Sequence, residues 1–111
     1  MATYSSSLPR TFAALSDPTR LAVVEQLVNG PASVTQLSAP FDMARPSFLK
    51  HLRVLEDAGL VTSAKVGRVR TVTLQQAALN GVESWVRFHR QKVEERLDRL
   101  GEFLEEDHKH G

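Results

Sequence analysis

Residues 45–74 read RPSFLKHLRVLEDAGLVTSAKVGRVRTVTL, and the hydrophobic pattern of this stretch changes at Gly59. Before the glycine, apolar residues recur at spacings of four and three, which is typical of one buried helix face; they are Phe48, Leu52 and Leu55. The pattern predicts a helix over about residues 45–58. Gly59-Leu60 predicts a Schellman end, in which a glycine adopts the left-handed conformation after the last turn.

After Gly59 the sequence favours extended structure, because Val and Thr are frequent in residues 61–64 and 70–74. The segment between them has Gly67 at its centre. Two β-branched segments around a glycine predict a β-hairpin over about residues 61–74. Basic residues lie at and near its tip, namely Lys65, Arg68 and Arg70.

Three shorter helices are predicted before this stretch. Apolar spacing predicts the first over about residues 7–15. The second begins after Asp17, a favourable N-cap, with Pro18 at the first helical position, where no N–H is needed. The third opens at Ser33, which is expected to form a capping box with Gln36, and is only about two turns long.

A long helix is predicted from about residue 76 to residue 106. Residues along one side recur at fours and threes, namely Val82, Val86, His89, Val93, Leu97, Leu100 and Leu104. A helix of about thirty residues spans roughly 45 Å, which is more than a chain of this size covers alone. The length favours a partner helix from a second copy of the chain; the alternative is that the helix folds back on its own core.

The composition indicates one globular domain, residues 1–111, because the hydrophobic fraction of 41% is ordinary for a folded protein. The chain has no cysteine, which excludes disulfides, thiolate metal sites and thiol redox sensing. No apolar run is long enough for a membrane span, and the N-terminus lacks a hydrophobic signal segment. We therefore expect a soluble cytoplasmic protein with no membrane partner.

The net charge is only +1, but the charged residues are distributed unevenly along the chain. Residues 43–74 carry six Lys and Arg against two acids, whereas residues 94–107 carry seven acids against two arginines. A basic middle segment matches a polyanion such as nucleic acid. The alternative is that these charges only solvate the surface.

The predicted order is α-α-α-α-β-β-α, a mainly α fold of the winged helix-turn-helix type, with the helix-turn-helix at about residues 33–58 and the wing at about residues 61–74. A helix fits the major groove of B-DNA, where the base edges present distinguishable donors and acceptors. We therefore expect the chain to bind double-stranded DNA. The candidate DNA-binding residues are Arg45, Ser47, Lys50, His51 and Arg53 on the helix, with Arg68 and Arg70 on the hairpin.

Three segments resemble a known family: FAALSDPTRL (residues 12–21), PSFLKHLRVLEDAGLV (residues 46–61) and GRVR (residues 67–70). They are similar, in turn, to the opening, the recognition helix and the wing of ArsR/SmtB-family repressors. The resemblance implies a homodimer built from the first and last helices, about residues 7–15 and 76–106. It also implies repression at an inverted-repeat operator that overlaps a promoter.

The sequence departs from this family at the positions that sense metals. Some members bind metal through cysteines before the turn, and others through an Asp-x-His pair and a later histidine in the last helix. Residues 33–37 hold no cysteine, and the last helix offers only His89, so we predict no metal site and no cofactor. Ala44 and Leu49 replace serines that are usual in the family, which questions the capping of the recognition helix and one DNA contact.

Several residues have two interpretations. His51 contacts DNA or packs at the edge of the core. His89 is favoured as an interface residue over a ligand, and Trp85 and Phe88 as core or interface residues over a ligand cage. A pocket near these aromatic residues is the first place to search for a small-molecule inducer, whose existence the sequence leaves open. The tail residues Asp107, His108 and His110 are favoured as solvated over metal-binding.

Two other classes of function are weaker. A winged-helix protein-interaction module without DNA binding would not need a basic helix next to a basic hairpin. An enzyme is disfavoured because the chain shows no Gly-rich phosphate loop, no nucleophile motif and no metal triad.

Overall fold

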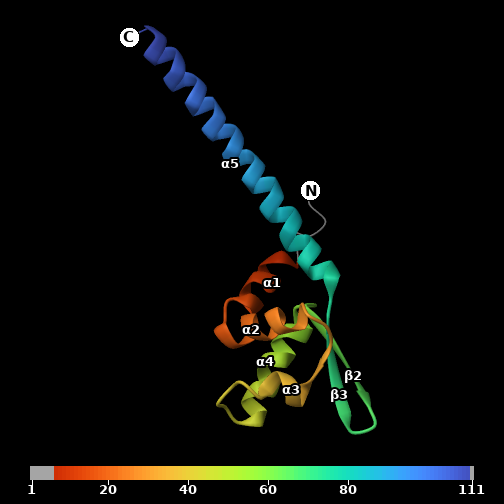
Figure 1. The fold of residues 1–111 in the computed structure, drawn as a ribbon. Helices are drawn as coiled ribbons and strands as arrows, with labels where there is room; N and C mark the ends of the chain where they lie inside the picture. The colour runs from red at the N-terminus through yellow and green to blue at the C-terminus, as the bar shows by residue number, and fades with distance from the viewer. Residues whose placement is uncertain (1–6, 111) are drawn as a thin grey trace. The chain divides into compact units, whose positions relative to one another are not determined.

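The computed structural model describes residues 7–110, with side chains from residue 7 to residue 106. Its helices and strands are α1 (Leu8–Leu15), α2 (Pro18–Leu27), β1 (Ala32–Ser33), α3 (Val34–Ser38), α4 (Arg45–Asp57), β2 (Val61–Val66), β3 (Val69–Leu74) and α5 (Gln76–His110) (Figure 1). The predicted order of four helices, a hairpin and a last helix is confirmed. Residues up to Gly81 form one compact unit, here called the N-terminal unit, and residues from Val82 form the C-terminal unit.

A three-stranded antiparallel sheet lies beside the helices of the N-terminal unit, with strand order β1-β3-β2. The β2–β3 hairpin turns at Gly67, whose φ of 63° is the left-handed conformation that a tight turn requires. The sequence did not predict β1. This strand has only two residues, too few for a readable period, and it forms by pairing with the distant β3.

The predicted helix starts of α2 and α3 are both present. The Asp17 side chain accepts a hydrogen bond from the Arg20 amide at 3.1 Å. Ser33 Oγ accepts from the Gln36 amide at 3.0 Å, while Gln36 Oε1 accepts from the Ser33 amide at 2.9 Å. These bonds satisfy amides that a helix leaves unpaired in its first turn, so the capping box is confirmed.

Helix α4 is fixed by its buried face and by its C-terminal end. The predicted face is confirmed, since Phe48, Leu52 and Leu55 are all buried. The Leu60 amide donates to the Leu55 carbonyl at 3.0 Å, and Gly59 has a φ of 76°, which confirms the Schellman end. Leu60 is itself fully buried, so the chain leaves α4 through the core and enters β2 in a defined direction.

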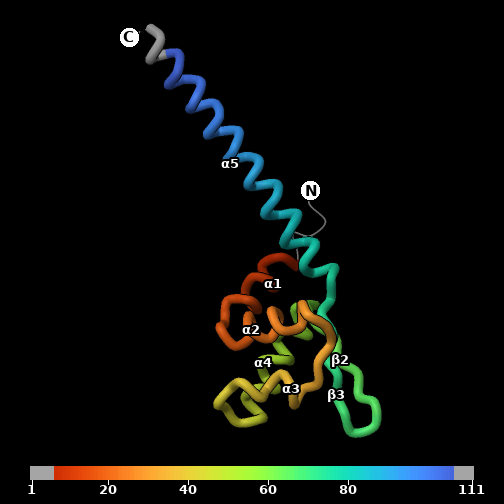
Figure 2. The backbone as a smooth tube through the Cα atoms, in the orientation of Figure 1, coloured from red at the N-terminus to blue at the C-terminus, as the bar shows by residue number. Residues whose placement is uncertain are grey.

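The core of the N-terminal unit joins the helix-turn-helix to the base of the hairpin. Its largest fully buried side chains come from α2, α3, α4, the α4–β2 turn and two strands; they are Phe48, Leu37, Leu55, Leu60, Val23, Val61 and Val72. Burial of each such side chain contributes about 1.5–3 kcal/mol. Figure 2 traces the loop of residues 39–44 that leads from α3 into α4.

The C-terminal unit is a continuous helix. The predicted apolar stripe is present on it, and most of its members are exposed in the single chain, namely Val86, Val93, Leu97, Leu100 and Leu104. Phe103 is also exposed. Within residues 7–110, no helix combines the length and the apolar character that crossing a lipid bilayer demands.

Candidate nucleic-acid interface

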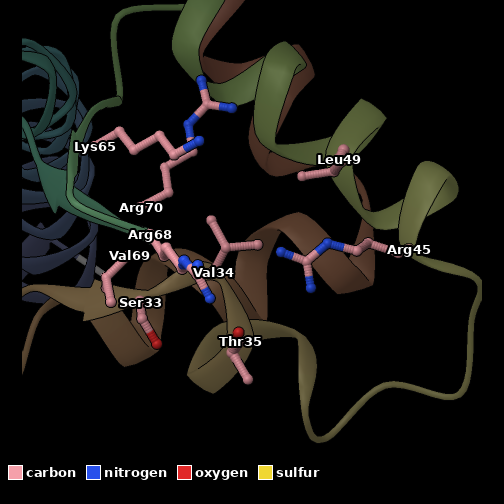
Figure 3. A pocket seen from close by; sticks show the side chains of 9 residues that line it. All are labelled: Ser33, Val34, Thr35, Arg45, Leu49, Lys65, Arg68, Val69 and Arg70. Atoms are coloured by element: carbon pink, nitrogen blue, oxygen red, sulfur yellow. The ribbon is translucent and has the colours of Figure 1, made fainter.

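A basic concave surface lies between the helix-turn-helix and the hairpin of the N-terminal unit (Figure 3). It encloses a cavity of about 440 Å³. Its nine lining residues, shown as sticks in Figure 3, are Ser33, Val34, Thr35, Arg45, Leu49, Lys65, Arg68, Val69 and Arg70. Four of these residues are cationic and none is acidic, so the surface is suited to a polyanion.

The cations reach this surface from two different elements. Arg45 comes from the first turn of α4, and Figure 3 shows its side chain extending toward the hairpin residues. Lys65 and Arg70 are paired across β2 and β3, and Arg68 lies in the turn between these strands. Because the core fixes α4 against the base of the hairpin, the fold brings together charges that are far apart in the sequence.

The outer face of α4 carries four of the predicted DNA-binding residues. Arg45, Ser47, Lys50 and Arg53 are all exposed. Their side chains make no hydrogen bond or ion pair with another residue in the described part of the chain. These donors are therefore available to an external partner.

The start of α4 lacks a side-chain cap. Ala44 is the N-cap residue and offers no oxygen to the first-turn amides, as its identity predicted. Pro46 follows within the first two helical positions and has no N–H of its own. This end of α4 therefore combines an uncapped helix start with the Arg45 guanidinium.

His51 lies elsewhere, on the side of α4 that meets α2. Arg20 Nη1 is 3.2 Å from His51 Nδ1, and Asp17 Oδ2 is 3.7 Å from the same nitrogen. Arg20 also donates from Nε to the Ala14 carbonyl at 2.7 Å, so it ties α1 and α2 to α4. An arginine only donates, so His51 Nδ1 is the acceptor in this hydrogen bond. This geometry favours the packing interpretation of His51.

The hydrogen bond from the Arg20 amide, helped by the nearby Arg20 charge, holds the pKa of Asp17 below its usual range although desolvation acts in the opposite direction. Asp17 is therefore ionised at neutral pH, which strengthens both the cap and its attraction for Arg20.

Arg70 is also engaged within the protein. Its Nε donates to Ser63 Oγ at 3.1 Å, and the Ser63 hydroxyl donates to Glu56 Oε1 at 2.9 Å. Arg70 Nη2 lies 3.8 Å from the same oxygen of Glu56. Two of the seven predicted residues, His51 and Arg70, thus have partners that the sequence did not reveal.

Lys65 also lines the cavity, although it was not among the predicted DNA-binding residues. The hairpin pattern could have predicted its position, because a turn centred on Gly67 pairs Lys65 with Arg70. Leu49 supplies an apolar wall to the cavity where the family usually has a serine.

The described residues offer no metal centre, since no group of three His, Asp or Glu side chains among them comes together. The suggested tail ligands Asp107, His108 and His110 lie outside the residues whose side chains are described. On α5, the His89 ring contacts two aromatic neighbours: its centroid lies 4.4 Å from that of Trp85 in a tilted arrangement and 5.2 Å from that of Phe88, edge to face.

Comparison with known proteins identifies the family. A family model described as a helix-turn-helix domain matches residues 15–64. HTH-type transcriptional regulator Rv2034 of Mycobacterium tuberculosis is 39% identical over 79 residues, which cover 71% of this chain and 73% of that protein. Transcriptional repressor SdpR of Bacillus subtilis is 27% identical over 75 residues, which cover 68% of this chain and 83% of that protein.

A crystal structure of an ArsR family transcriptional regulator superimposes with a TM-score of 0.79 at 46% identity, covering 85% of this chain and 97% of that one. The extent of these matches, and the winged helix-turn-helix on which they fall, place the chain in the ArsR family of transcriptional regulators.

Proposed function

We propose that this protein is a sequence-specific transcriptional repressor that binds an inverted-repeat DNA operator as a homodimer. The observation that carries the proposal is the basic concave surface, where Arg45 from the recognition helix and three cations from the hairpin line one cavity without an acid. A double helix presents closely spaced phosphates next to a groove, and this surface pairs phosphate-binding cations with an exposed helix face.

The exposed residues of α4 are proposed to enter the major groove. Lys50 and Arg53 project from its outer face, and Ser47 from its first turn, within reach of base edges or phosphates. Arg45 and Arg68 are proposed to hold phosphates on the two sides of the concave surface. The other predicted residues, His51 and Arg70, are proposed to act through their contacts within the protein.

The second copy is proposed to cover the apolar stripe of the C-terminal unit. Its exposed aliphatic residues line a groove of about 400 Å³ formed by Val93, Arg96, Leu97 and Leu100. An exposed stripe of this length is a typical association surface. Pairing two chains would present two recognition helices to half-sites about 34 Å apart, one turn of DNA. Bound there, the dimer would exclude polymerase from an overlapping promoter.

Fluorescence anisotropy tests the proposal with the DNA upstream of the protein's own gene and a scrambled duplex, each over a series of salt concentrations. We expect tight binding to the upstream DNA alone, with two subunits per site and an affinity that falls steeply with salt as counterions are released. Equal or absent binding to both duplexes would contradict it. Binding to a protein partner without salt dependence would support the interaction-module alternative, and measured turnover would support an enzyme.

A small organic inducer, if the repressor has one, is proposed to bind on α5 beside His89, whose ring contacts those of Trp85 and Phe88. Trp85 is the only tryptophan of the chain, so its fluorescence reports on this cluster directly. Quenching of Trp85 by a compound that also releases the DNA would support the site. Release without any change in fluorescence would place the inducer elsewhere.

A further inference from the structure

We infer that Glu56, Ser63 and Arg70 form a clamp that sets the angle between the recognition helix and the wing, and that Arg70 serves DNA binding as a positioning residue. The inference deepens the proposed function and rests on it for its effect on DNA. It reassigns Arg70, which charge alone would place among the phosphate contacts.

The direction of each hydrogen bond in the clamp is fixed by chemistry. The Glu56 carboxylate only accepts, so the Ser63 hydroxyl donates its single proton to Oε1, at 2.9 Å. The Ser63 oxygen then keeps its lone pairs for Arg70 Nε, which donates at 3.1 Å. The Arg70 charge lies 3.8 Å from the same carboxylate oxygen, which favours this arrangement over other orientations of the guanidinium.

The clamp joins three elements: the last turn of α4, the middle of β2 and the start of β3. The core holds the hairpin from its base, where Val61 is buried, up to the level of Ser63, whose β3 partner Val72 is buried. Beyond Ser63, the β2 residues Lys65 and Val66 are exposed. Strand β1 holds β3 one level further, where Ser33 pairs with Thr71, and Ser63 is where the clamp ties the hairpin to α4.

The distance of the clamp from the hairpin tip means that a small rotation at the clamp displaces the tip of the wing. From Ser63 to the turn is about four residues of strand, or roughly 13 Å, so a rotation of about ten degrees at Ser63 moves the tip by roughly 2 Å. Arg68 lies at this tip. A displacement of that size is enough to lose a phosphate contact whose hydrogen bond must be near 2.9 Å.

Charge alone and the clamp predict opposite results for Glu56. An acid beside a DNA-binding surface repels phosphates, so on charge alone Glu56→Ala should strengthen binding. Loss of the clamp should instead weaken it. Asp57 is a matched control, because it is an exposed acid next to Glu56 on α4 with no side-chain partner among the described residues.

The test measures anisotropy with the upstream and scrambled duplexes for Ser63→Ala, Ser63→Thr, Glu56→Ala and Asp57→Ala. We expect Ser63→Ala and Glu56→Ala to weaken binding to the upstream DNA about 3- to 10-fold, the effect of losing one or two hydrogen bonds. The salt slope of Ser63→Ala should match the wild type, since no phosphate contact residue is removed, and Ser63→Thr should restore affinity. Wild-type affinity of Ser63→Ala, or stronger binding by both acid variants, would overturn the inference.

Amide hydrogen exchange without DNA separates this inference from the proposed function. Ser63→Ala should accelerate exchange in the β2–β3 hairpin and leave the buried part of α4 unchanged. Unchanged exchange in the hairpin would overturn the clamp even if the wild type binds DNA. If the wild type binds neither duplex, the proposed function fails, and the exchange result alone decides whether the clamp exists.

Discussion

The two units of this protein differ in how far their apolar residues are exposed to solvent. Phe48 in the N-terminal unit is 0% exposed, whereas Phe103 in the C-terminal unit is 66% exposed. The first unit closes a core around itself and uses it to hold charged side chains at fixed positions. The second presents a long apolar stripe that one copy of the chain does not cover, so its stability and role depend on association. The difference separates a unit that contacts DNA from one that brings two such units together.

The largest expected effect comes from the closed core. Phe48→Ala should lower the free energy of unfolding by about 3–5 kcal/mol, because it leaves a cavity where no other side chain can collapse. Phe103→Ala is the matched change on the exposed stripe and should cost the N-terminal unit far less. Urea unfolding followed by circular dichroism measures both. Equal losses of unfolding free energy in the two variants would contradict the distinction between a closed core and an exposed stripe.

The next effect tests the exposed stripe. Leu97→Glu places a charge in the proposed interface and should shift the protein from dimer to monomer, with DNA affinity falling about 100-fold through lost avidity. Gln91→Glu introduces the same charge on the opposite side of α5 and should leave both properties near wild type. Sedimentation velocity and anisotropy provide the readouts. A dimeric Leu97→Glu variant with full affinity would show that the stripe has another use.

A smaller effect is expected at the wing. Arg68→Ala should weaken binding to all DNA sequences about tenfold, as loss of one charge-assisted contact does. Its salt slope should fall by about one, in contrast to the unchanged slope expected for Ser63→Ala. A salt series with upstream and scrambled DNA measures this. A loss confined to the upstream DNA would indicate base recognition by Arg68.

The smallest effect concerns the helix cap at Asp17 and depends on pH. The pKa of this carboxyl is lowered in the folded protein, so its stabilisation is present at neutral pH and is lost as the pH falls below about 4. Asp17→Ala should therefore melt at a lower temperature than the wild type at neutral pH, and the difference should shrink in acid. Asp17→Asn keeps a cap oxygen and serves as the control. A difference that does not change with pH would contradict the role of the ionised carboxyl.

The sequence predicted the features that depend on neighbouring residues. The buried face of α4 follows from the spacing of Phe48, Leu52 and Leu55, and the caps at Asp17 and Ser33 follow from residues three positions apart. These features were confirmed because helix periodicity and capping are local.

Features that depend on distant residues could not be predicted from these patterns. Strand β1 exists only through pairing with β3, some forty residues later. The partner of His51 is Arg20 on another helix, and Arg70 is held through Ser63 by Glu56. Basic residues looked equivalent in the sequence, and only the three-dimensional arrangement separates those that face outward from those that fasten elements together.

Selection of bound duplexes from a random DNA library by the wild-type protein, followed by sequencing, tests the central claim most directly. Two basic surfaces joined through paired α5 helices should enrich two inverted half-sites whose centres lie about one turn of DNA apart. No enrichment, or a single asymmetric half-site bound by one subunit, would contradict the account of a dimeric, sequence-specific repressor.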